Sequence, residues 1–319
     1  MRLELSPDLI GLLRCPKCYS DLSISNNELI CNNSTCNKHY PYVNKIPILI
    51  NEEESIFLIS DFIHHNNTTF NYTENKLKKA AKLLTPKIGK NFRANDNFNN
   101  FFEHIFKNQK KPKILVIGGS IIGEGLSKHY QNCMIDFIST DVSFGPTTNL
   151  ISDAHNIPFG QNTFDGVIIQ AVLEHVLDPY RCMDEIHRVL KTTGYIYVET
   201  PFMQQVHMGK YDFQRFTHLG HRRLLRQFEE IESGPTAGPG TALAWSYKYF
   251  LRSFVKNKLL KEIVISFAHF SAFWLKYFDF FLLNKPGVFD SASGYYFIGK
   301  YSNTIISDKE ILNQYKGLG

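Results

Sequence analysis

From residue 113 onward the sequence predicts an α/β fold, with helices covering both faces of a Rossmann-like parallel sheet. Short apolar segments alternate there with amphipathic ones, which is typical of strands joined by crossover helices. The first apolar segment ends in a glycine-rich loop. In addition, four of the six cysteines lie within residues 15–36, which predicts a small separate module in front of the sheet.

Length and composition fit this organisation. The chain has 319 residues, and at roughly 150 residues per domain this corresponds to about two domains. Apolar residues make up 43% and charged residues 20% of the chain, which argues against a largely disordered protein. The net charge of +5 is too small to indicate a nucleic-acid-binding protein by itself.

The four N-terminal cysteines form two pairs with the spacing of metal knuckles. Cys15 and Cys18 give C-x2-C, and Cys31 and Cys36 give C-x4-C. A zinc ion takes four thiolates from two such turns, and so short a segment builds no core of its own. We therefore expect a closed, structural zinc site in preference to disulfides. Residues 22–24 and 28–30 predict a hairpin between the knuckles, and residues 41–50 predict its closing strand.

Composition shifts along the chain predict four regions. Residues 1–50 form the zinc ribbon, and residues 51–111 form a linker with capping helices at 74–84 and 98–106. Residues 112–302 form the α/β domain, with an aromatic helical insertion at 241–283, and residues 303–319 form a C-terminal tail.

Within the α/β domain, strands are predicted at 113–117, 135–139, 166–171 and 194–199. Strand 294–301 is predicted to pair with residues 228–232. Asp178 followed by Pro179 predicts the start of a helix, because aspartate caps a helix and proline suits its first position.

The loop after the first strand has the features of a nucleoside site. Glycines at 118, 119, 123 and 125 allow a sharp turn and a close approach to a ligand. Asp141 lies at the tip of the second strand, where its carboxylate can accept hydrogen bonds from both ribose hydroxyls. By itself this pair of features fits a dinucleotide as well.

Further motifs follow in order over about 90 residues. They are the runs SDAHNIPF (152–159), FDGV (164–167), LEHV (173–176) and RVLK (188–191). Together with the glycine loop and Asp141, they make the chain resemble class I S-adenosylmethionine-dependent methyltransferases of the LEHV branch. The resemblance implies S-adenosylmethionine as cofactor and argues against hydride transfer.

The resemblance also implies roles for individual residues. Asp153 is expected to contact the adenine amino group, Ala154 to add a backbone contact, and Gln170 to lie beside the methionine part. Two positions depart from the family pattern: Val116 stands where an acidic residue is usual, and Ser120 replaces a glycine. The cofactor-binding residues predicted are Gly118, Gly119, Ser120, Gly123, Asp141, Asp153, Ala154 and Gln170.

The cysteine segment carries a resemblance of its own. The runs LRCPKC (13–18) and YPYVNKIPIL (40–49) resemble the short zinc-ribbon domain that activates tRNA methyltransferases. The second knuckle departs from that pattern, because four residues separate Cys31 from Cys36 where two are usual.

The loop after the fifth strand supplies the catalytic candidates. Ligands of open parallel sheets bind beyond the carboxyl ends of the strands, so residues 200–223 are expected to cover the reacting methyl group. His207, Asp212 and Arg215 are polar candidates there, and His175 directly follows the fourth strand. A histidine suits removal of the proton from an oxygen nucleophile. Alternatively, Asp212 and Arg215 pair to brace the loop, and the histidines are structural.

Three functions remain open at this point. The first is methyl transfer to a small or carrier-bound metabolite (a sugar, a lipid-linked saccharide or a secondary metabolite), with O-methylation favoured. The second is an RNA (ribosomal RNA guanine) methyltransferase, because one such family also joins an N-terminal zinc module to this fold. The third is a non-catalytic docking protein. The aromatic and apolar insertion speaks against RNA.

The aromatic insertion leaves its partners open as well. Its aromatic side chains fit core packing, a protein interface, a hydrophobic substrate or shallow membrane contact. Residues 263–283 are not expected to span a membrane, because His269, Lys276 and Asp279 interrupt them. Residues 1–13 lack the pattern of an export signal, so with cysteines as metal ligands we expect a cytoplasmic protein.

Overall fold

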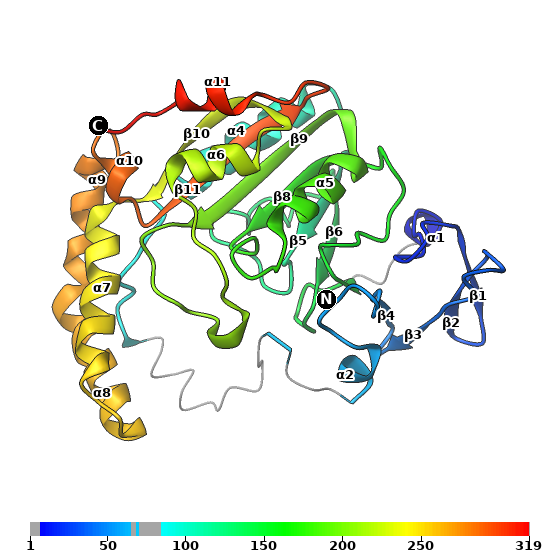
Figure 1. Ribbon diagram of the computed structural model, residues 1–319, viewed down its shortest axis with the longest axis horizontal. Coiled ribbons are helices and arrows are strands. Elements are labelled where there is room, and N and C mark those ends of the chain that lie inside the picture. The colour runs from blue at the N-terminus through cyan, green and yellow to red at the C-terminus, as the bar shows by residue number, and fades with distance from the viewer. Residues whose placement is uncertain (1–6, 65–67, 70–83, 319) are drawn as a thin grey trace.

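The computed structural model describes residues 7–64, 68–69 and 84–318 (Figure 1). These residues contain one sheet of eleven strands in the order β1-β2-β3-β4-β7-β6-β5-β8-β9-β11-β10. Strands β4 (Ile46–Leu49), β7 (Leu150–Ser152), β6 (Asp136–Asp141), β5 (Lys113–Ile117), β8 (Phe164–Gln170) and β9 (Leu190–Pro201) run parallel to one another. The Rossmann-like α/β fold expected from the sequence is confirmed.

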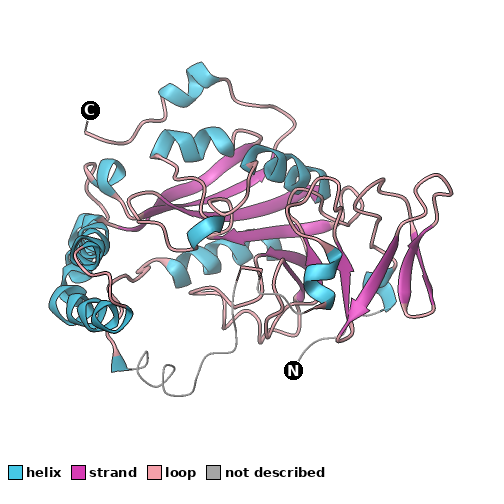
Figure 2. Ribbon diagram, turned by 60° about the horizontal axis from the view of Figure 1, so that its bottom comes forward, coloured by secondary structure: helices cyan, strands magenta, loops and turns pink. Residues whose placement is uncertain are grey.

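Helices cover both faces of this sheet (Figure 2). Alternate residues of a strand point to opposite faces of a sheet. In the central strand β8, Val167 and Ile169 belong to one hydrophobic cluster, and Ile168 belongs to another. Helix α5 (Pro179–Val189) packs on the first face. Helix α4 (Ala94–Phe106) packs on the second, so the expected helix at 98–106 is present and begins four residues earlier.

The predicted helix boundary at Asp178 is also confirmed. The Asp178 side chain accepts a hydrogen bond from the backbone N–H of Arg181, and Pro179 stands at the first helical position of α5. The other expected helix in this part of the chain, at 74–84, lies outside the described residues except for Leu84.

The N-terminal hairpin forms as expected from β1 (Leu22–Ser25) and β2 (Glu28–Cys31). The single closing strand expected at 41–50 is wrong. The chain forms β3 (His39–Val43) and β4, joined by Asn44 and Lys45, whose positive φ angles of 51° and 66° make a tight two-residue turn. Because β4 pairs with β7, the N-terminal segment extends the large sheet.

The antiparallel edge carries the insertion. Strand β11 (Gly294–Tyr301) lies between β9 and β10 (Phe228–Ala237), and Phe228 pairs with Tyr301 as expected. The insertion contains α7 (Pro239–Ser253), α8 (Lys258–Ala272), a 3-10 segment at Phe273–Phe278 and α9 (Asp279–Leu282). Figure 1 shows α7 and α8 as a pair at the edge of the molecule.

A buried carboxylate fixes the insertion. Asp279 accepts the backbone N–H groups of Gly240 and Thr241 at 2.8 and 3.0 Å, at the N-terminus of α7. A negative charge is favourable there, because the first N–H groups of a helix lack partners within it. Across residues 7–64, 68–69 and 84–318, no helix has the length and apolar character needed to cross a membrane.

The remaining helices are short. They are α1 (Pro7–Ile10), α2 (Ile59–Ile63), the 3-10 turn η1 (Gly209–Tyr211), α6 (His218–Leu224), α10 (Val288–Ser291) and α11 (Asp308–Leu312).

Candidate active site

A cavity opens beyond the carboxyl ends of the central strands, and we call it the cofactor cavity. Seven of the eight residues predicted to bind a cofactor line it, namely Gly118, Ser120, Gly123, Asp141, Asp153, Ala154 and Gln170. Gly119 is not among the lining residues. Its N–H donates to the carbonyl of Thr140 at 3.0 Å, and a Cβ at this position would lie 2.8 Å from Cβ of Ser139.

The glycine loop turns sharply because two of its residues have no side chain. Gly118 has a φ of +73°, and a Cβ at this position would lie 2.2 Å from a methyl group of Val172. A Cβ at Gly123 would collide with the side chain of Gln170. The loop also holds the predicted ribose ligand, because the N–H of Ser120 donates to the carboxylate of Asp141 at 3.0 Å. Burial raises the pKa of Asp141.

Asp153 is held rigidly at the opposite side of the cavity. Its carboxylate accepts from Nδ1 of His155 at 2.6 Å, from the N–H of His155 at 3.0 Å and from the hydroxyl of Ser55 at 2.5 Å. Burial raises the pKa of Asp153, but these hydrogen bonds outweigh burial and keep it below its ordinary value. A carboxylate has about four acceptor positions, so one more donor can be accommodated.

Sequence reasoning missed part of this cavity. Ile56, Phe57 and Thr69 line it, although residues 51–111 were expected to be a linker with capping helices. Nearby, Glu54 pairs with Arg181 and accepts from Asn156. No local motif marks residues 54–57, because their position follows from the pairing of β4 with β7.

A second cavity, which we call the acceptor cavity, lies between the sheet edge and the insertion. Ala171 lines both cavities, and its φ of +51° is unusual for a residue with a side chain. The remaining lining residues come from segments far apart in the sequence, and the polar ones among them are Lys87, Lys90, Asn91, Glu199, Thr200, Gln204, Thr236, Thr241, Lys248, His269 and Ser293.

Lys248 is a buried cation in the acceptor cavity. The residue is 9% exposed, and its ammonium lies 3.4 Å from the centre of the Trp245 ring. No ion pair or hydrogen bond joins this ammonium to a residue of the described ranges. Burial, with a smaller effect of Arg252, lowers the pKa of Lys248 to about 8. An unpaired buried cation of this kind favours an anionic ligand.

Glu199 connects the two cavities through hydrogen bonds. Its carboxylate accepts from the hydroxyl of Tyr197, from Asn91 at 3.0 Å and from Gln170 at 3.1 Å. Gln170 in turn lines the cofactor cavity. Burial raises the pKa of Glu199 to about 7.

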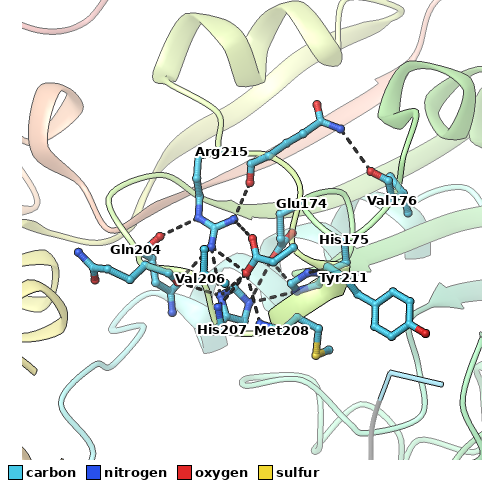
Figure 3. A network of polar contacts seen from close by, with 12 residues as sticks. Glu174, His175, Val176, Gln204, Val206, His207, Met208, Tyr211 and Arg215 are labelled. Carbon is cyan, nitrogen blue, oxygen red and sulfur yellow. Dashed lines mark hydrogen bonds and ion pairs between the residues drawn. The ribbon is translucent and has the colours of Figure 1, made fainter. Parts of the chain in front are cut away.

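Polar contacts join the four catalytic candidates and Glu174 in one network, and Figure 3 labels Glu174, His175, His207 and Arg215 of it. Arg215 pairs with Asp212 through two contacts of 2.5 and 3.0 Å and donates to the carbonyl of Gln204 at 2.7 Å. Although burial raises the pKa of Asp212, its hydrogen bond with Arg215 holds that pKa well below the ordinary value. This geometry fits the alternative that Asp212 and Arg215 brace the loop.

The two histidines face each other within this network. Nε2 of His175 lies 3.1 Å from Nε2 of His207, and Nδ1 of His175 lies 2.7 Å from the carbonyl of Tyr211. His175 lines the cofactor cavity, and burial, with a smaller effect of His207, lowers its pKa to about 4. Burial also lowers the pKa of His207. Glu174, beside them, is fully buried.

The four N-terminal cysteines also converge. Their sulfur atoms all lie within 4.8 Å of one another, with Cys18 3.4 Å from Cys31 and Cys15 3.7 Å from Cys36. A tetrahedral zinc ion with Zn–S bonds of 2.3 Å requires sulfur atoms about 3.8 Å apart. The arrangement is therefore compatible with a four-cysteine metal site.

Comparisons with known proteins find similar sequences and similar solved structures. Residues 129–198 match a family described as a methyltransferase domain. A 76-residue stretch is 36% identical to a Rattus norvegicus protein named arginine-hydroxylase NDUFAF5, mitochondrial. That stretch covers 24% of this chain and only 20% of the relative, and a Mus musculus protein of the same name matches at 34% identity.

Similar solved structures include a putative sarcosine dimethylglycine methyltransferase from Galdieria sulphuraria. It shares 12% identity with a TM-score of 0.44, over 77% of this chain and 98% of that one. Another is phosphoethanolamine N-methyltransferase 2 of Haemonchus contortus in complex with S-adenosyl-L-methionine. It shares 14% identity with a TM-score of 0.41, over 68% and 55% of the two chains.

Proposed function

The chain is a class I S-adenosylmethionine-dependent methyltransferase, and from that premise we propose that it methylates a hydroxyl of a phosphate-bearing, lipid-linked saccharide. The observation that carries this proposal is the acceptor cavity, which adjoins the cofactor cavity at Ala171 and contains the unpaired ammonium of Lys248. Membership of the family implies neither O-methylation nor a lipid-linked acceptor, and both are part of this proposal.

The cofactor supplies an electrophilic methyl group, and the acceptor oxygen forms a bond to it as the bond to sulfur breaks. The chain's own contribution is to hold and align the two partners. Gly118 and Gly123 let the backbone approach the cofactor, Asp141 holds the ribose, and Asp153 holds the adenine amino group. His175 lines the cofactor cavity and contacts Glu174 and His207, so this cluster is the part of the chain suited to activating the hydroxyl.

The cationic groups of the acceptor cavity support a phosphate. Lys248, Lys87 and Lys90 all line it, together with His269. The backbone carrying Lys87 is fixed, because Lys276 donates to its carbonyl at 2.5 Å. Charge-assisted hydrogen bonds from such lysines to phosphate oxygens are about twice as strong as neutral ones.

The outer face of the insertion supports a lipid carrier. Leu260, Ile263, Phe267, Phe270 and Trp274 recur at a spacing of three or four residues, so they form one stripe, and each keeps 49% or more of its surface exposed. On the same helix Ala268 and Ala272 are buried. Lysines at 256, 258 and 261 lie at the start of the stripe, which suits an anionic membrane surface.

We further propose that Cys15, Cys18, Cys31 and Cys36 hold a structural zinc ion and that the protein acts in the reducing cytoplasm. The sulfur distances support the metal, and reduced thiolates are maintained in that compartment. The segment after this site supplies Ser55, which donates to Asp153. Zinc in the ribbon therefore supports the cofactor cavity indirectly.

Labelled methyl transfer tests the proposed function. Purified protein and methyl-labelled S-adenosylmethionine are added to a cytoplasmic extract with membranes, from which endogenous cofactor has been removed, and the products are fractionated. We expect label in the lipid-extractable fraction with wild type and none with Asp141→Ala. Label in RNA, or label confined to water-soluble small molecules, would contradict the lipid-linked acceptor. Failure of folded wild type to bind cofactor would contradict the enzyme.

A further inference from the structure

Three ligand atoms of the Glu174, His175 and His207 cluster are arranged around one point. Oε1 of Glu174 lies 3.5 Å from Nε2 of His175 and 3.7 Å from Nε2 of His207, and the two nitrogens are 3.1 Å apart. The point equidistant from the three atoms is about 2.0 Å from each. Bonds from zinc to histidine nitrogen and carboxylate oxygen have this length.

The outer nitrogen of His175 faces an acceptor, which leaves its inner nitrogen with a lone pair. The outer nitrogen of His207 has acceptors nearby and also lies 3.4 Å from Nη2 of Arg215, which can only donate. Nδ1 of His175 lies 2.7 Å from the carbonyl oxygen of Tyr211, so this nitrogen carries the hydrogen of the neutral ring. Nδ1 of His207 lies 3.3 Å from the carbonyl of Gln205 and 3.5 Å from a carboxylate oxygen of Asp212. Metal-binding histidines are typically oriented by such outer contacts.

Glu174 adds to the cluster a buried carboxyl group without a hydrogen bond in the described part of the chain. The residue is fully buried, and neither carboxylate oxygen has a hydrogen-bond partner among the described residues. The nearby Arg215 is committed to Asp212 by two contacts, so those two charges balance each other. A buried carboxylate without hydrogen bonds is costly unless a cation accompanies it.

We propose that Glu174, His175 and His207 bind a divalent transition-metal ion of the zinc type. Two imidazole nitrogens and one carboxylate oxygen suit a zinc-type ion. Mg²⁺ and Ca²⁺ instead prefer ligand sets made of oxygen atoms. Three protein ligands leave at least one coordination position open, as in catalytic zinc sites. His175 lines the cofactor cavity, so the cluster borders the site proposed for methyl transfer.

In the reaction, which rests on the function proposed above, an ion held by these three residues would offer an open position for the acceptor hydroxyl oxygen. Such an ion would lower the pKa of a bound O–H group, so that its proton could pass to water while the oxygen forms a bond to the methyl carbon and the carbon–sulfur bond breaks. His175 and His207 are then positioning ligands of the ion, and neither has to act as the general base.

Metal counting tests the site without any activity measurement. Protein dialysed against Zn²⁺ and then against metal-free buffer is analysed by elemental mass spectrometry. We expect His207→Ala to hold one zinc ion per chain fewer than wild type. The matched control His64→Gln, an exposed histidine outside the cluster, should hold as many as wild type. Equal zinc in wild type and His207→Ala would overturn the proposal.

A second measurement does not depend on variants. Anomalous diffraction at the zinc edge, from crystals of the wild-type protein grown with Zn²⁺, should show a peak between Glu174, His175 and His207, apart from any peak at the four cysteines. No peak at the cluster would overturn the site. A peak there with no methyl transfer to lipids would leave the metal site standing and contradict the proposed function instead.

Discussion

The cofactor cavity and the acceptor cavity meet at Ala171 but are built in different ways. The cofactor cavity is lined mainly by consecutive residues at the ends of β5, β6, β7 and β8, and Asp141 and Asp153 in it are held by hydrogen bonds. The acceptor cavity combines distant segments, and its buried ammonium on Lys248 has no ion pair or hydrogen bond among the described residues. The first therefore follows from the α/β fold, and the second depends on the insertion at 241–283.

The largest expected effect is on the affinity for the cofactor, and it distinguishes the functions of the two cavities. Asp141→Ala should weaken binding of S-adenosylmethionine about 1000-fold, because two charge-assisted hydrogen bonds to the ribose are each worth roughly 2 kcal/mol. Inorganic phosphate should bind the acceptor cavity unchanged, since Asp141 does not line it. Calorimetric titration of both ligands checks this. Undiminished cofactor binding by the variant would show that Asp141 does not hold the ribose.

The second effect is on the pH dependence of stability, through Glu199, which lines the acceptor cavity. Burial raises the pKa of Glu199 from 4.5 to about 7, so the folded protein keeps this proton longer than the unfolded chain does. The free energy of unfolding of wild type should therefore fall by about 3 kcal/mol, relative to that of Glu199→Gln, as the pH rises from 4.5 to 7.5. Above pH 7.5 the difference between the two proteins should stay constant. Urea unfolding at several pH values measures this difference.

Asp153 in the cofactor cavity supplies a control of opposite sign. Hydrogen bonds from His155 and Ser55 outweigh burial and lower its pKa, so its stabilising contribution is present above the ordinary pKa and is lost as the pH falls. Relative to Asp153→Asn, wild type should gain stability as the pH rises through the acidic range. A difference between wild type and Glu199→Gln that is constant with pH would show that Glu199 titrates normally.

Lys248→Met should affect the acceptor alone. We expect the KM for the acceptor to rise about 30-fold, because a charge-assisted contact with phosphate is worth roughly 2 kcal/mol. The Kd for S-adenosylmethionine should stay within a factor of two. Lys309→Met, at an exposed position on α11, serves as the matched control. If Lys248→Met changes cofactor affinity as strongly as acceptor KM, the two cavities do not divide the ligands as described.

The smallest expected effect concerns the outer face of the insertion. Phe267→Ser combined with Phe270→Ser removes two exposed rings from the stripe, at 59% and 57% exposure. Binding to vesicles of phosphatidylcholine and phosphatidylglycerol should fall about 10-fold, while the melting temperature stays close to that of wild type. Sedimentation with vesicles measures the change. Equal vesicle binding by the two proteins would remove the support for a lipid carrier.

The sequence predicted those parts of the molecule whose signals are local. The glycine loop, Asp141 and the strands around them are encoded by runs of a few residues, and the structure forms these strands with the loop and Asp141 at their carboxyl ends. The cysteine knuckles are equally local, and their sulfur atoms converge. The strand expected at 41–50 failed because the two residues Asn44 and Lys45 adopt a left-handed turn that an apolar pattern does not reveal.

Contacts between residues far apart in the chain could not be predicted from the sequence. Ile56 and Phe57 reach the cofactor cavity only because β4 adds to the sheet beside β7. The unpaired state of Lys248 depends on how α7 and α8 pack over the sheet edge. Glu174 was noted as part of a motif, but its lack of hydrogen bonds and its approach to His207, 33 positions later, appear only in three dimensions.

A crystal structure with S-adenosylhomocysteine and inorganic phosphate tests most directly whether the two cavities divide the ligands at Ala171. We predict that the cofactor occupies the cavity between Asp141 and Asp153, with its sulfur atom at Ala171 facing the acceptor cavity. Phosphate should contact the ammonium of Lys248. A cofactor sulfur facing away from Ala171, or phosphate bound elsewhere while Lys248 stays without a ligand, would contradict this division.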